Sequence, residues 1–484
     1  MRREMKGWDE NEAHTEIDFE EADPAHPILD LAELFSIKRD GRYKLRLIAL
    51  GNILRQGIDF KETFAPTVSA DGLRWFLSMA CAAGKKIKGG DISTAYLTGK
   101  QRTNLAAFIP SFGELHRMSW EELERMRADL LKMEEREGVR AIRRLSKRRG
   151  RPKKLWRINR PVYGIPDAGN AFALKFMTDH TEKLGFEQSK VDPCIYWKYR
   201  YADRAHDVPD EGEQAAADEA ERLAGTLGVD SPLKTKRVIG YIVLISWVDD
   251  VRYYGSDELV EWYDREAPKI MPIVIEDSPE EFVSLEVKQD LEAGTLEVTQ
   301  SKYFLAAGKK FAEHLERLLS KKLPETPFPE NEKVVEGTDE ERAAAAGLPY
   351  RELVGTLAYP SAYTRLDIRR EVSELSRFLH APTIVHWRLA LRVLLYCIGT
   401  HDLGLMYSQN IDPHGVNVLY AYADSNFEAP KSTGCRMVFM NGAVVSASMQ
   451  RHSTVDTSTT CAELTEAFRC GCDRSATASA SGGV

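Results

Sequence analysis

Three aspartates could together hold metal ions, although they stand far apart in the chain. Asp249 and Asp250 directly follow residues 238–248, a run rich in β-branched and aromatic residues that predicts a buried strand. Asp91 stands far upstream, in a segment that continues to Tyr96. Because a buried charge needs a compensating partner, and carboxylates bind hard cations, these side chains could hold two metal ions for phosphoryl transfer. An Asp-Asp pair is equally ordinary in a turn, so the pair alone leaves both interpretations open.

A second group of residues could bind a polyanion. Residues 140–154 contain nine basic residues and no acidic one. We predict that five of them neutralise nucleic-acid phosphates: Arg148, Arg149, Arg151, Lys153 and Lys154. The segment Arg149-Gly-Arg151-Pro resembles the core of an AT-hook, which lies in a narrow minor groove. A flexible basic loop or a localisation signal explains the same composition, and it is favoured over specific groove binding.

The composition bounds the class of protein without choosing one. A chain of 484 residues is long enough for about two to four domains. Its 66 basic and 74 acidic residues give a formal net charge of −8, which does not exclude a local basic surface. Seven cysteines form no C-x-x-C pair, so we expect reduced thiols and an intracellular protein. The first residues lack an apolar core and the longest apolar run is shorter than the ~20 residues of a membrane span, so we expect neither secretion nor a membrane.

A series of short blocks links the chain to a known family. The blocks are residues 43–51, Gln56–Pro66 (QGIDFKETFAP), Asp91–Leu97 (DISTAYL), Pro161–Ala168 (PVYGIPDA), Trp247–Asp250 (WVDD), Phe282–Val287 (FVSLEV) and Tyr422–Phe427 (YADSNF). In number and order they resemble the reverse transcriptase of copia-type LTR retrotransposons, followed by part of a ribonuclease H domain. Each block alone is a modest signal, so the resemblance rests on the whole set, from about residue 35 to residue 470.

The resemblance implies an α+β fold. It implies a right-hand polymerase with fingers, palm and thumb, followed by a helical connection and a partial ribonuclease H-like domain. The predicted boundaries are a disordered acidic tail at 1–27, fingers and palm at 28–312, thumb and connection at 313–417, and a truncated ribonuclease H-like domain at 418–484. A basic insertion at 113–154 and an acidic insertion at 201–237 interrupt the fingers and palm.

The resemblance also implies a reaction. The chain is expected to be an RNA-directed DNA polymerase that transfers a nucleotide to a primer 3′-hydroxyl by a two-metal mechanism. Asp91, Asp249 and Asp250 would be its catalytic residues and would bind two Mg²⁺ ions, with Mn²⁺ as a substitute. The expected partners are an RNA template, a DNA primer, the RNA–DNA hybrid and deoxynucleoside triphosphates. The expected location is the cytoplasm, a virus-like particle or the nucleus, and the oligomeric state is left open.

Three further residues acquire substrate roles from the resemblance. Tyr96 stands five residues after Asp91, where reverse transcriptases carry an aromatic steric gate against ribonucleotides; a core aromatic is the alternative. Lys44 and Arg46 alternate with apolar residues, so they share one face of a strand. The resemblance makes them triphosphate contacts, and a solvated strand face is the alternative.

Several positions depart from the family pattern. Trp247 replaces a tyrosine, Ser284 replaces a glycine, and Asp167–Asn170 replace the family's Gln-Ala-Pro-Arg. The last block contacts template and incoming nucleotide in the family. The departures motivate an alternative function, that of a degenerate, catalytically inactive polymerase-like nucleic-acid-binding protein. A host-adopted structural or regulatory protein that uses the basic segment is a further alternative.

The C-terminal part resembles a ribonuclease H domain that lacks one of its carboxylates. Asp424 matches the first catalytic carboxylate of that domain, and Glu463 matches the second. Asp473 stands too close to Glu463 to be the third, and the residues after it contain no acid. A nuclease site needs enough carboxylates to hold two metal ions. We therefore expect ribonuclease H activity to be lost.

Overall fold

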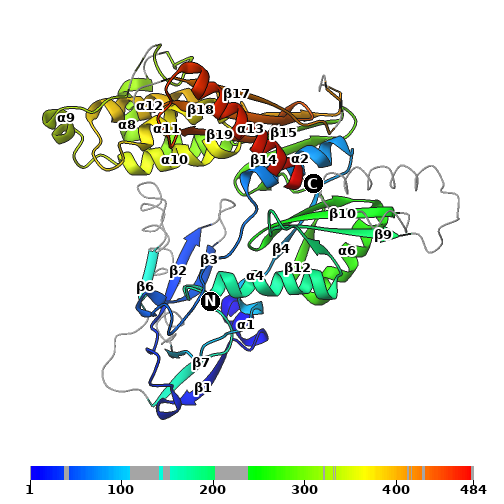
Figure 1. The fold of residues 1–484 in the computed structure, drawn as a ribbon. Coiled ribbons are helices and arrows are strands. Elements are labelled where there is room, and N and C mark those ends of the chain that lie inside the picture. The colour runs from blue at the N-terminus through cyan, green and yellow to red at the C-terminus, as the bar shows by residue number, and fades with distance from the viewer. Residues whose placement is uncertain are drawn as a thin grey trace.

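The computed structural model describes residues 2–37, 43–109, 141–144, 153–201, 238–319, 322–330, 332, 334–410, 414–415, 417–427 and 431–480. In Figure 1, the N-terminal strands lie at one end of the molecule, a central sheet lies in the middle, and a helical region with further strands lies at the other end. Helices are mixed with antiparallel sheets, as the predicted α+β class requires.

The N-terminal residues form a small folded unit. Its elements are α1 (Arg2–Glu10), β1 (His14–Asp18), β2 (Leu31–Ile37), β3 (Tyr43–Ala49), β5 (Ala106–Phe108), β6 (Ala141–Arg144) and β7 (Lys154–Ile158). One sheet has the order β1-β7-β5 and another has the order β3-β2-β6. Trp8 of α1 is fully buried, with its ring centroid 6.0 Å from that of Trp156. The prediction of a disordered tail at 1–27 is therefore wrong for residues 2–27, because apolar side chains within this acidic segment are buried in the unit.

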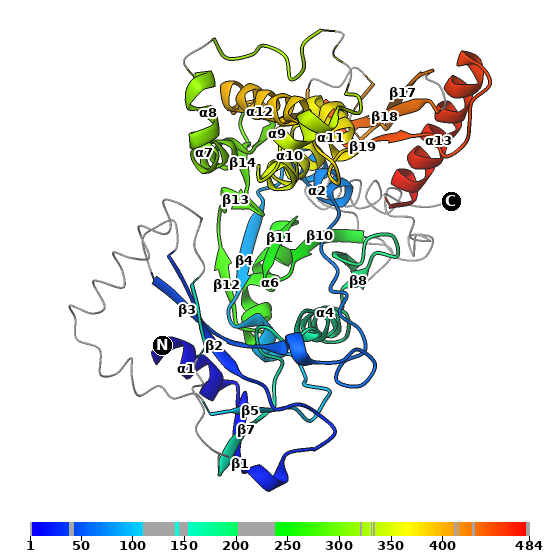
Figure 2. The same ribbon diagram turned by 90° about the vertical axis from the view of Figure 1, so that its left-hand side faces the viewer.

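The centre of the molecule is a six-stranded antiparallel sheet (Figure 2). Its strands, in spatial order, are β12 (Ile273–Glu276), β4 (Lys88–Ile92), β11 (Asp250–Gly255), β10 (Val238–Trp247), β9 (Ile195–Tyr201) and β8 (Glu187–Gln188). α2 (Ala70–Ala82) packs on one face, and α4 (Ala168–Thr178) and α6 (Asp257–Ile270) pack on the other. Successive residues of β10 enter opposite cores: Val243 joins the α2 side and Leu244 joins the other. The prediction of a buried strand before Asp249 is confirmed.

A four-stranded sheet leads into the helical region. It contains β13 (Glu281–Phe282), β14 (Leu285–Asp290), β15 (Thr295–Thr299) and β16 (Leu405–Ser408), in that order. Between β15 and β16 lie α7 (Ser301–Lys310), α8 (Ala312–Leu319), α9 (Asp339–Ala344), α10 (Tyr350–Tyr363), α11 (Arg369–Ser376) and α12 (Ile384–Gly399). Phe304, Leu357 and Leu394 belong to a core that these helices build among themselves. The helical region is thus stabilised largely by its own packing.

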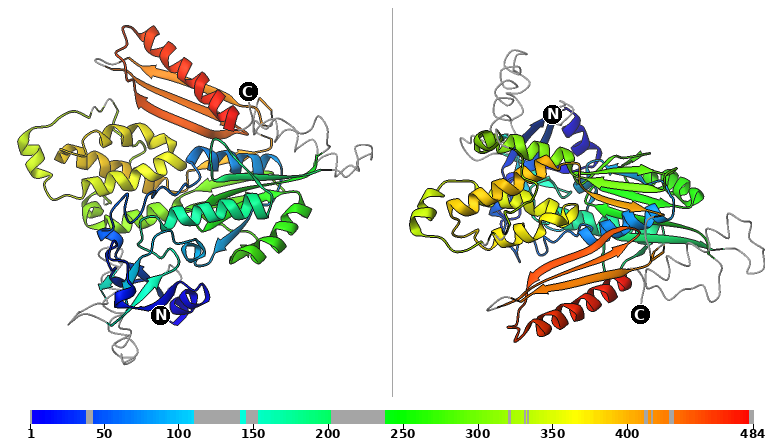
Figure 3. Two further views of the ribbon diagram at one scale, coloured as in Figure 1. Left: turned by 60° about the horizontal axis from the view of Figure 1, so that its bottom comes forward. Right: turned by 90° about the horizontal axis from the view of Figure 1, so that it is seen from above.

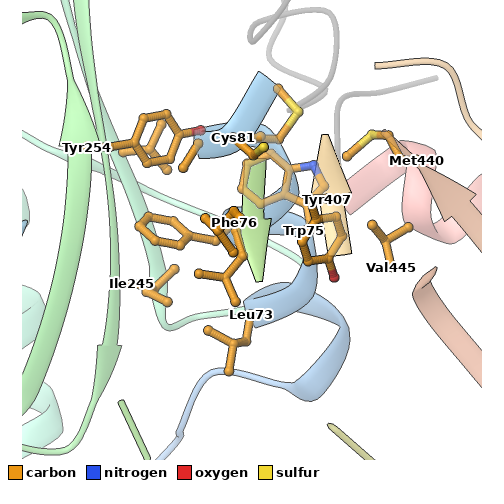
Figure 4. Packing of buried hydrophobic residues seen from close by; sticks show 14 of the residues in the cluster. Leu73, Trp75, Phe76, Cys81, Ile245, Tyr254, Tyr407, Met440 and Val445 are labelled. Carbon is orange, nitrogen blue, oxygen red and sulfur yellow. The ribbon is translucent and has the colours of Figure 1, made fainter. Parts of the chain in front are cut away.

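The C-terminal unit shares its core with the centre of the molecule. β17 (Tyr420–Asn426), β18 (Thr433–Met440) and β19 (Ala443–Arg451) form a sheet, and α13 (Thr459–Ala480) packs along it (Figure 3). In Figure 4, Trp75 and Phe76 of α2 lie within one cluster that also holds Tyr407 and Val445. The Arg74 Nε–H donates to the Val445 carbonyl oxygen at 3.1 Å. The C-terminal sheet is therefore attached by a common hydrophobic core and a buried hydrogen bond.

The two predicted insertions lie largely outside the described residues. Of the basic insertion at 113–154, the structure describes residues 141–144 and 153–154, and of the acidic insertion at 201–237 it describes Tyr201. Residues 141–144 form β6, which pairs with β2. None of the helices in the described ranges is both long and apolar enough to span a bilayer.

Candidate active site

Strand register brings the predicted aspartates together. β4 and β11 are antiparallel neighbours, and Asp91 is the direct partner of Asp250. β10 and β11 form a tight hairpin in which Trp247 pairs with Asp250, so Val248 and Asp249 make the turn. The backbone N–H of Ile92 donates to the Asp249 carbonyl oxygen at 2.8 Å. Because directly paired residues project to the same face of a sheet, Asp91, Asp250 and Trp247 share one face.

The hairpin turn holds a backbone conformation that its residue type disfavours. Val248 has a φ of +53°, in the left-handed region. For a β-branched residue this conformation costs about 1–2 kcal/mol, since Cβ approaches the following carbonyl oxygen. The Asp249-Asp250 pair is thus placed at the sheet by a strained two-residue turn. Strain of this kind persists where the surrounding structure fixes the backbone, and here the strands on both sides of β11 do so.

The environments of the aspartates differ. Asp91 is exposed, whereas Asp250 is half-buried. Burial raises the pKa of Asp250 to about 7; the guanidinium of Arg252 opposes this shift, and the charges of Glu276 and Asp249 add to it. Carboxylate oxygens are the ligands that Mg²⁺ prefers, so the donor set fits a magnesium site chemically. Within the described ranges, however, no three His, Cys, Asp or Glu side chains converge closely enough to hold an ion.

Tyr96 lies beside the aspartates. It belongs to a short 3-10 helix, Ala95–Thr98, directly after β4. Burial raises its pKa, and the next largest cause is the charge of Asp249. Its ring centroid lies 4.8 Å from that of Tyr163 and 6.4 Å from that of Phe172. Tyr96 is half-buried, so its position is compatible with both the gate and the core interpretation.

Tyr163 is a site residue that the sequence interpretation did not single out. The guanidinium carbon of Arg46 lies 4.5 Å from the centre of the Tyr163 ring, a cation–π contact. Burial raises the pKa of Tyr163 to about 12, with Arg46 opposing and Asp249 adding to the shift. Tyr163 therefore links Arg46 to Tyr96 and lies near Asp249. Its place in the Pro161–Ala168 block was the signal that could have revealed it.

The glycine after Tyr163 explains how this block meets β3. Gly164 has a φ of +92°, and a Cβ there would lie 2.0 Å from the Ala49 carbonyl oxygen. The Ala49 N–H donates to the Tyr163 carbonyl oxygen at 2.7 Å. Only glycine permits this approach, which brings β3 and its Arg46 to Tyr163. Lys44 lies two residues before Arg46 in β3, but its side chain is outside the described residues.

The hairpin of the Phe282–Val287 block shows the backbone conformation at one departure from the family pattern, Ser284 in place of glycine. Val283 and Ser284 connect β13 to β14 and have φ values of +53° and +61°. Positive φ at both central positions defines the turn type that favours asparagine and glycine. The family's glycine suits the conformation at position 284, whereas Ser284 adopts it under strain.

Five basic residues are predicted to contact nucleic acid. Arg148, Arg149 and Arg151 lie outside the described residues. Lys153 is exposed. Lys154 begins β7, and its ammonium lies 3.3 Å from a carboxylate oxygen of Asp18 and 3.6 Å from one of Glu16. Lys154 is therefore paired with acids of β1 within the protein.

The ribonuclease H-like residues occupy exposed positions. Asp424 lies on β17, opposite Cys435, and Glu463 lies in the first turns of α13. Three residues later, Glu466 is fully buried and accepts from Arg436 Nη1 at 2.8 Å. The side chain of Asp473 is outside the described residues. The two motif carboxylates are thus held less firmly than the buried glutamate beside them.

The chain is similar to reverse transcriptases and to Pol polyproteins of plant transposons. The family described as "Reverse transcriptase (RNA-dependent DNA polymerase)" matches residues 32–113. The chain is 24% identical over 453 residues to the Pol polyprotein from transposon TNT 1-94 of Nicotiana tabacum, covering 90% of this chain and 28% of that protein. It is 23% identical to the Pol polyprotein from transposon RE2 of Arabidopsis thaliana, covering 87% of this chain and 24% of that protein. These matches confirm the predicted resemblance to the reverse transcriptases of copia-type retrotransposons.

Two further facts qualify these matches. The chain spans only about a quarter of the length of the curated relatives it matches. Among solved structures, the foamy viral protease-reverse transcriptase in complex with dsDNA aligns with a TM-score of 0.41 and 10% identity, over 99% of this chain and 71% of that one.

Proposed function

We propose that this chain carries out RNA-directed DNA synthesis as the reverse transcriptase part of a Pol polyprotein. The observation that carries the proposal is the pairing of Asp91 with Asp250 across β4 and β11, with Asp249 in the adjoining turn. The match of residues 32–113 supports it, because the description of the matching family names an RNA-dependent DNA polymerase. The proposed partners are an RNA template, a DNA primer, their hybrid and deoxynucleoside triphosphates.

The proposed chemistry is nucleotidyl transfer. Asp91, Asp249 and Asp250 would hold Mg²⁺, which would supply charge neutralisation at the phosphates. The primer 3′-hydroxyl attacks the α-phosphate, the bond to the β-phosphate breaks to release pyrophosphate, and the hydroxyl proton passes to solvent. The residues of the chain would contribute mainly positioning. Arg46 lies on the Tyr163 ring and would offer its guanidinium to a triphosphate. Tyr96 packs on the same ring and would contact the sugar.

Primer extension tests this proposal. The wild-type chain is expected to extend oligo(dT) on poly(rA) with deoxythymidine triphosphate and Mg²⁺. Asp249→Asn should lower the rate by about a thousandfold, because a lost metal ligand forfeits several kcal/mol of charge stabilisation. Asp339→Asn is the matched control, since Asp339 is an exposed aspartate of α9 paired with Arg342. Absence of extension by the wild type, or full activity of Asp249→Asn, would overturn the proposal.

One observation favours the alternative, a catalytically inactive nucleic-acid-binding protein. Arg252 forms an ion pair with Asp250 and so engages one of the three proposed metal ligands. Under this alternative the chain binds an RNA–DNA hybrid but does not extend a primer. Fluorescence anisotropy with a labelled hybrid, measured beside primer extension on the same preparation, separates the two functions.

A further inference from the structure

Arg252 is a buried cation beside the proposed metal ligands. It follows Asp250 by two positions in β11, so both side chains project to the same face of the sheet. Its side chain is only 4% exposed, compared with 31% for that of Asp250. An arginine side chain stays positively charged in proteins, even where it is buried. The centre of the sheet therefore contains a permanent positive charge next to the aspartates.

The guanidinium of Arg252 is fixed by contacts from two strands, β11 and β13. Nη1 donates to Asp250 Oδ1 and, at 2.8 Å, to the carbonyl oxygen of Val251. Nη2 donates to the Glu281 carbonyl oxygen of β13. The guanidinium carbon lies 4.8 Å from the centre of the Phe282 ring. These contacts leave Arg252 in one orientation, toward Asp250 and the β13–β14 hairpin.

The opposite strand provides the space for this guanidinium. Gly89 is the β4 partner of Arg252, and a Cβ at position 89 would lie 2.6 Å from Arg252 Nη1. A second obstacle would be Pro279, whose Cγ would lie 2.8 Å from the same Cβ. Gly89, two positions before Asp91, thus leaves room for Arg252, two positions after Asp250. Both strands that supply the proposed ligands are shaped around Arg252.

The positive charge of Arg252 affects how Asp250 can bind a metal ion. A buried arginine without a counter-ion is strongly unfavourable, so Arg252 needs the negative charge of Asp250. A divalent cation that approaches Asp250 meets a fixed positive charge and competes for the same carboxylate. We infer that Arg252 acts as a built-in counter-ion that holds Asp250 and lowers the affinity of this site for divalent cations. The inference rests on the proposed function, and it makes Arg252 a positioning residue for Asp250.

The test measures metal affinity without nucleic acid or nucleotide. Mn²⁺ binding to the full chain is followed by electron paramagnetic resonance at pH 8. Arg252→Met removes the charge and keeps much of the volume, and it should bind Mn²⁺ about tenfold more tightly than the wild type. Arg252→Lys keeps a positive charge and should stay near the wild-type affinity. Arg265→Met, at an exposed arginine of α6, makes the same change of net charge away from the sheet and controls for it.

A double variant shows whether the effect passes through Asp250. In Asp250→Asn with Arg252→Met, the gain in Mn²⁺ affinity should disappear. Thermal unfolding without metal gives a second readout: Asp250→Asn alone should lower the melting temperature, because it leaves Arg252 unpaired, and adding Arg252→Met should restore most of the loss. If Arg252→Met does not unfold cooperatively, Arg252→Gln, which keeps amide donors without charge, replaces it.

The outcomes separate this inference from the proposed function. Equal or weaker Mn²⁺ affinity in a folded, charge-removing variant would overturn the role of Arg252, even if the wild type extends primers. A gain that survives Asp250→Asn would also overturn it. Failure of primer extension combined with the tenfold gain would overturn the proposed polymerase function and leave Arg252 as a counter-ion in an inactive site.

Discussion

The central sheet and the C-terminal sheet both carry motif aspartates, but the two sheets support them differently. Asp91 and Asp250 lie on adjacent strands inside a six-stranded sheet that has a core on each face. Asp424 lies on β17, an edge strand of a three-stranded sheet, where its side chain is exposed. A strand with neighbours on both sides is fixed in register, whereas an edge strand is held on one side only. Inner strands can therefore align carboxylates from distant segments.

In the C-terminal unit, the firmly held charges occupy other positions. His452 is fully buried, with Nδ1 2.6 Å from an Asp456 oxygen and Nε2 3.1 Å from a Glu466 oxygen. Glu466 also pairs with Arg436. This network ties α13 to β18 and to the end of β19, so buried carboxylates here stabilise the fold. The comparison teaches that a motif match identifies a candidate residue. The burial of that residue and the side chains around it determine whether it can bind a metal ion or stabilise the fold.

The largest effect should come from breaking the buried network. Glu466→Ala should lower the free energy of unfolding by about 3–5 kcal/mol, because Arg436 loses its buried partner. Urea denaturation followed by circular dichroism measures the change. Glu463→Ala, three residues earlier on the exposed side of α13, is the control and should change stability by about 0.5 kcal/mol or less. If both variants lose the same free energy of unfolding, the buried Glu466 does not stabilise the fold more than the exposed Glu463.

The next effect is a pH dependence that belongs to the central sheet. Burial raises the pKa of Asp250 from 3.8 to about 7. Between these values the unfolded chain releases the proton while the folded chain retains it, so the free energy of unfolding falls as the pH rises through this window. The fall is at most about 4 kcal/mol, at about 1.4 kcal/mol per pKa unit.

Denaturant titrations from pH 4 to pH 8 without divalent cations measure this dependence. Asp250→Asn should be free of the fall, so the difference in stability between this variant and the wild type should change with pH across the window. Asp424→Asn, at an exposed aspartate of the other sheet, should follow the wild-type curve. An identical pH profile for the wild type and Asp250→Asn would show that the central sheet does not perturb this carboxyl group.

A smaller effect concerns Tyr96. If its ring excludes the ribose 2′-hydroxyl, Tyr96→Ala should reduce discrimination against ribonucleotides by about tenfold or more, with the fold intact. Steady-state incorporation of ribo- and deoxyribonucleotides gives the ratio of kcat/KM. Tyr96→Phe keeps the ring against Tyr163 and serves as the control. Unchanged discrimination in Tyr96→Ala, with a lower melting temperature, would assign Tyr96 to the core.

The last prediction is that changes at the ribonuclease H-like carboxylates have no effect on cleavage of an RNA–DNA hybrid. Asp424→Asn and Glu463→Gln should leave an RNA–DNA hybrid as intact as the wild type does, because two exposed carboxylates position metal ions poorly. A labelled RNA strand incubated with Mg²⁺ or Mn²⁺ and separated on a gel measures this. Cleavage by the wild type that Asp424→Asn abolishes would show an active nuclease, and the two sheets would then both carry working sites.

Much of the candidate site followed from residue types and local spacing. The apolar run at 238–248 predicted β10, and the aspartates after it were predicted as ligands because a buried strand seldom ends in two charges without a partner. Residues 2–27 were misjudged, because an average acidic composition hides the few apolar side chains, such as Trp8, that a fold can bury. Tyr163 was missed because a single tyrosine in a motif carries no periodicity.

The sequence by itself determined the resemblance to copia-type reverse transcriptases, the central strand and the identity of the aspartates, since each depends on local order and composition. Only the tertiary structure decided that Asp91 faces Asp250, that Tyr163 lies under Arg46, and that Arg252 holds Asp250. Some of these contacts join segments that are distant in the chain. The contact of Arg252 with Asp250 depends on the space that Gly89 leaves for the Arg252 side chain on the neighbouring strand. Register and packing arise from the whole fold, and no local pattern of residues specifies them.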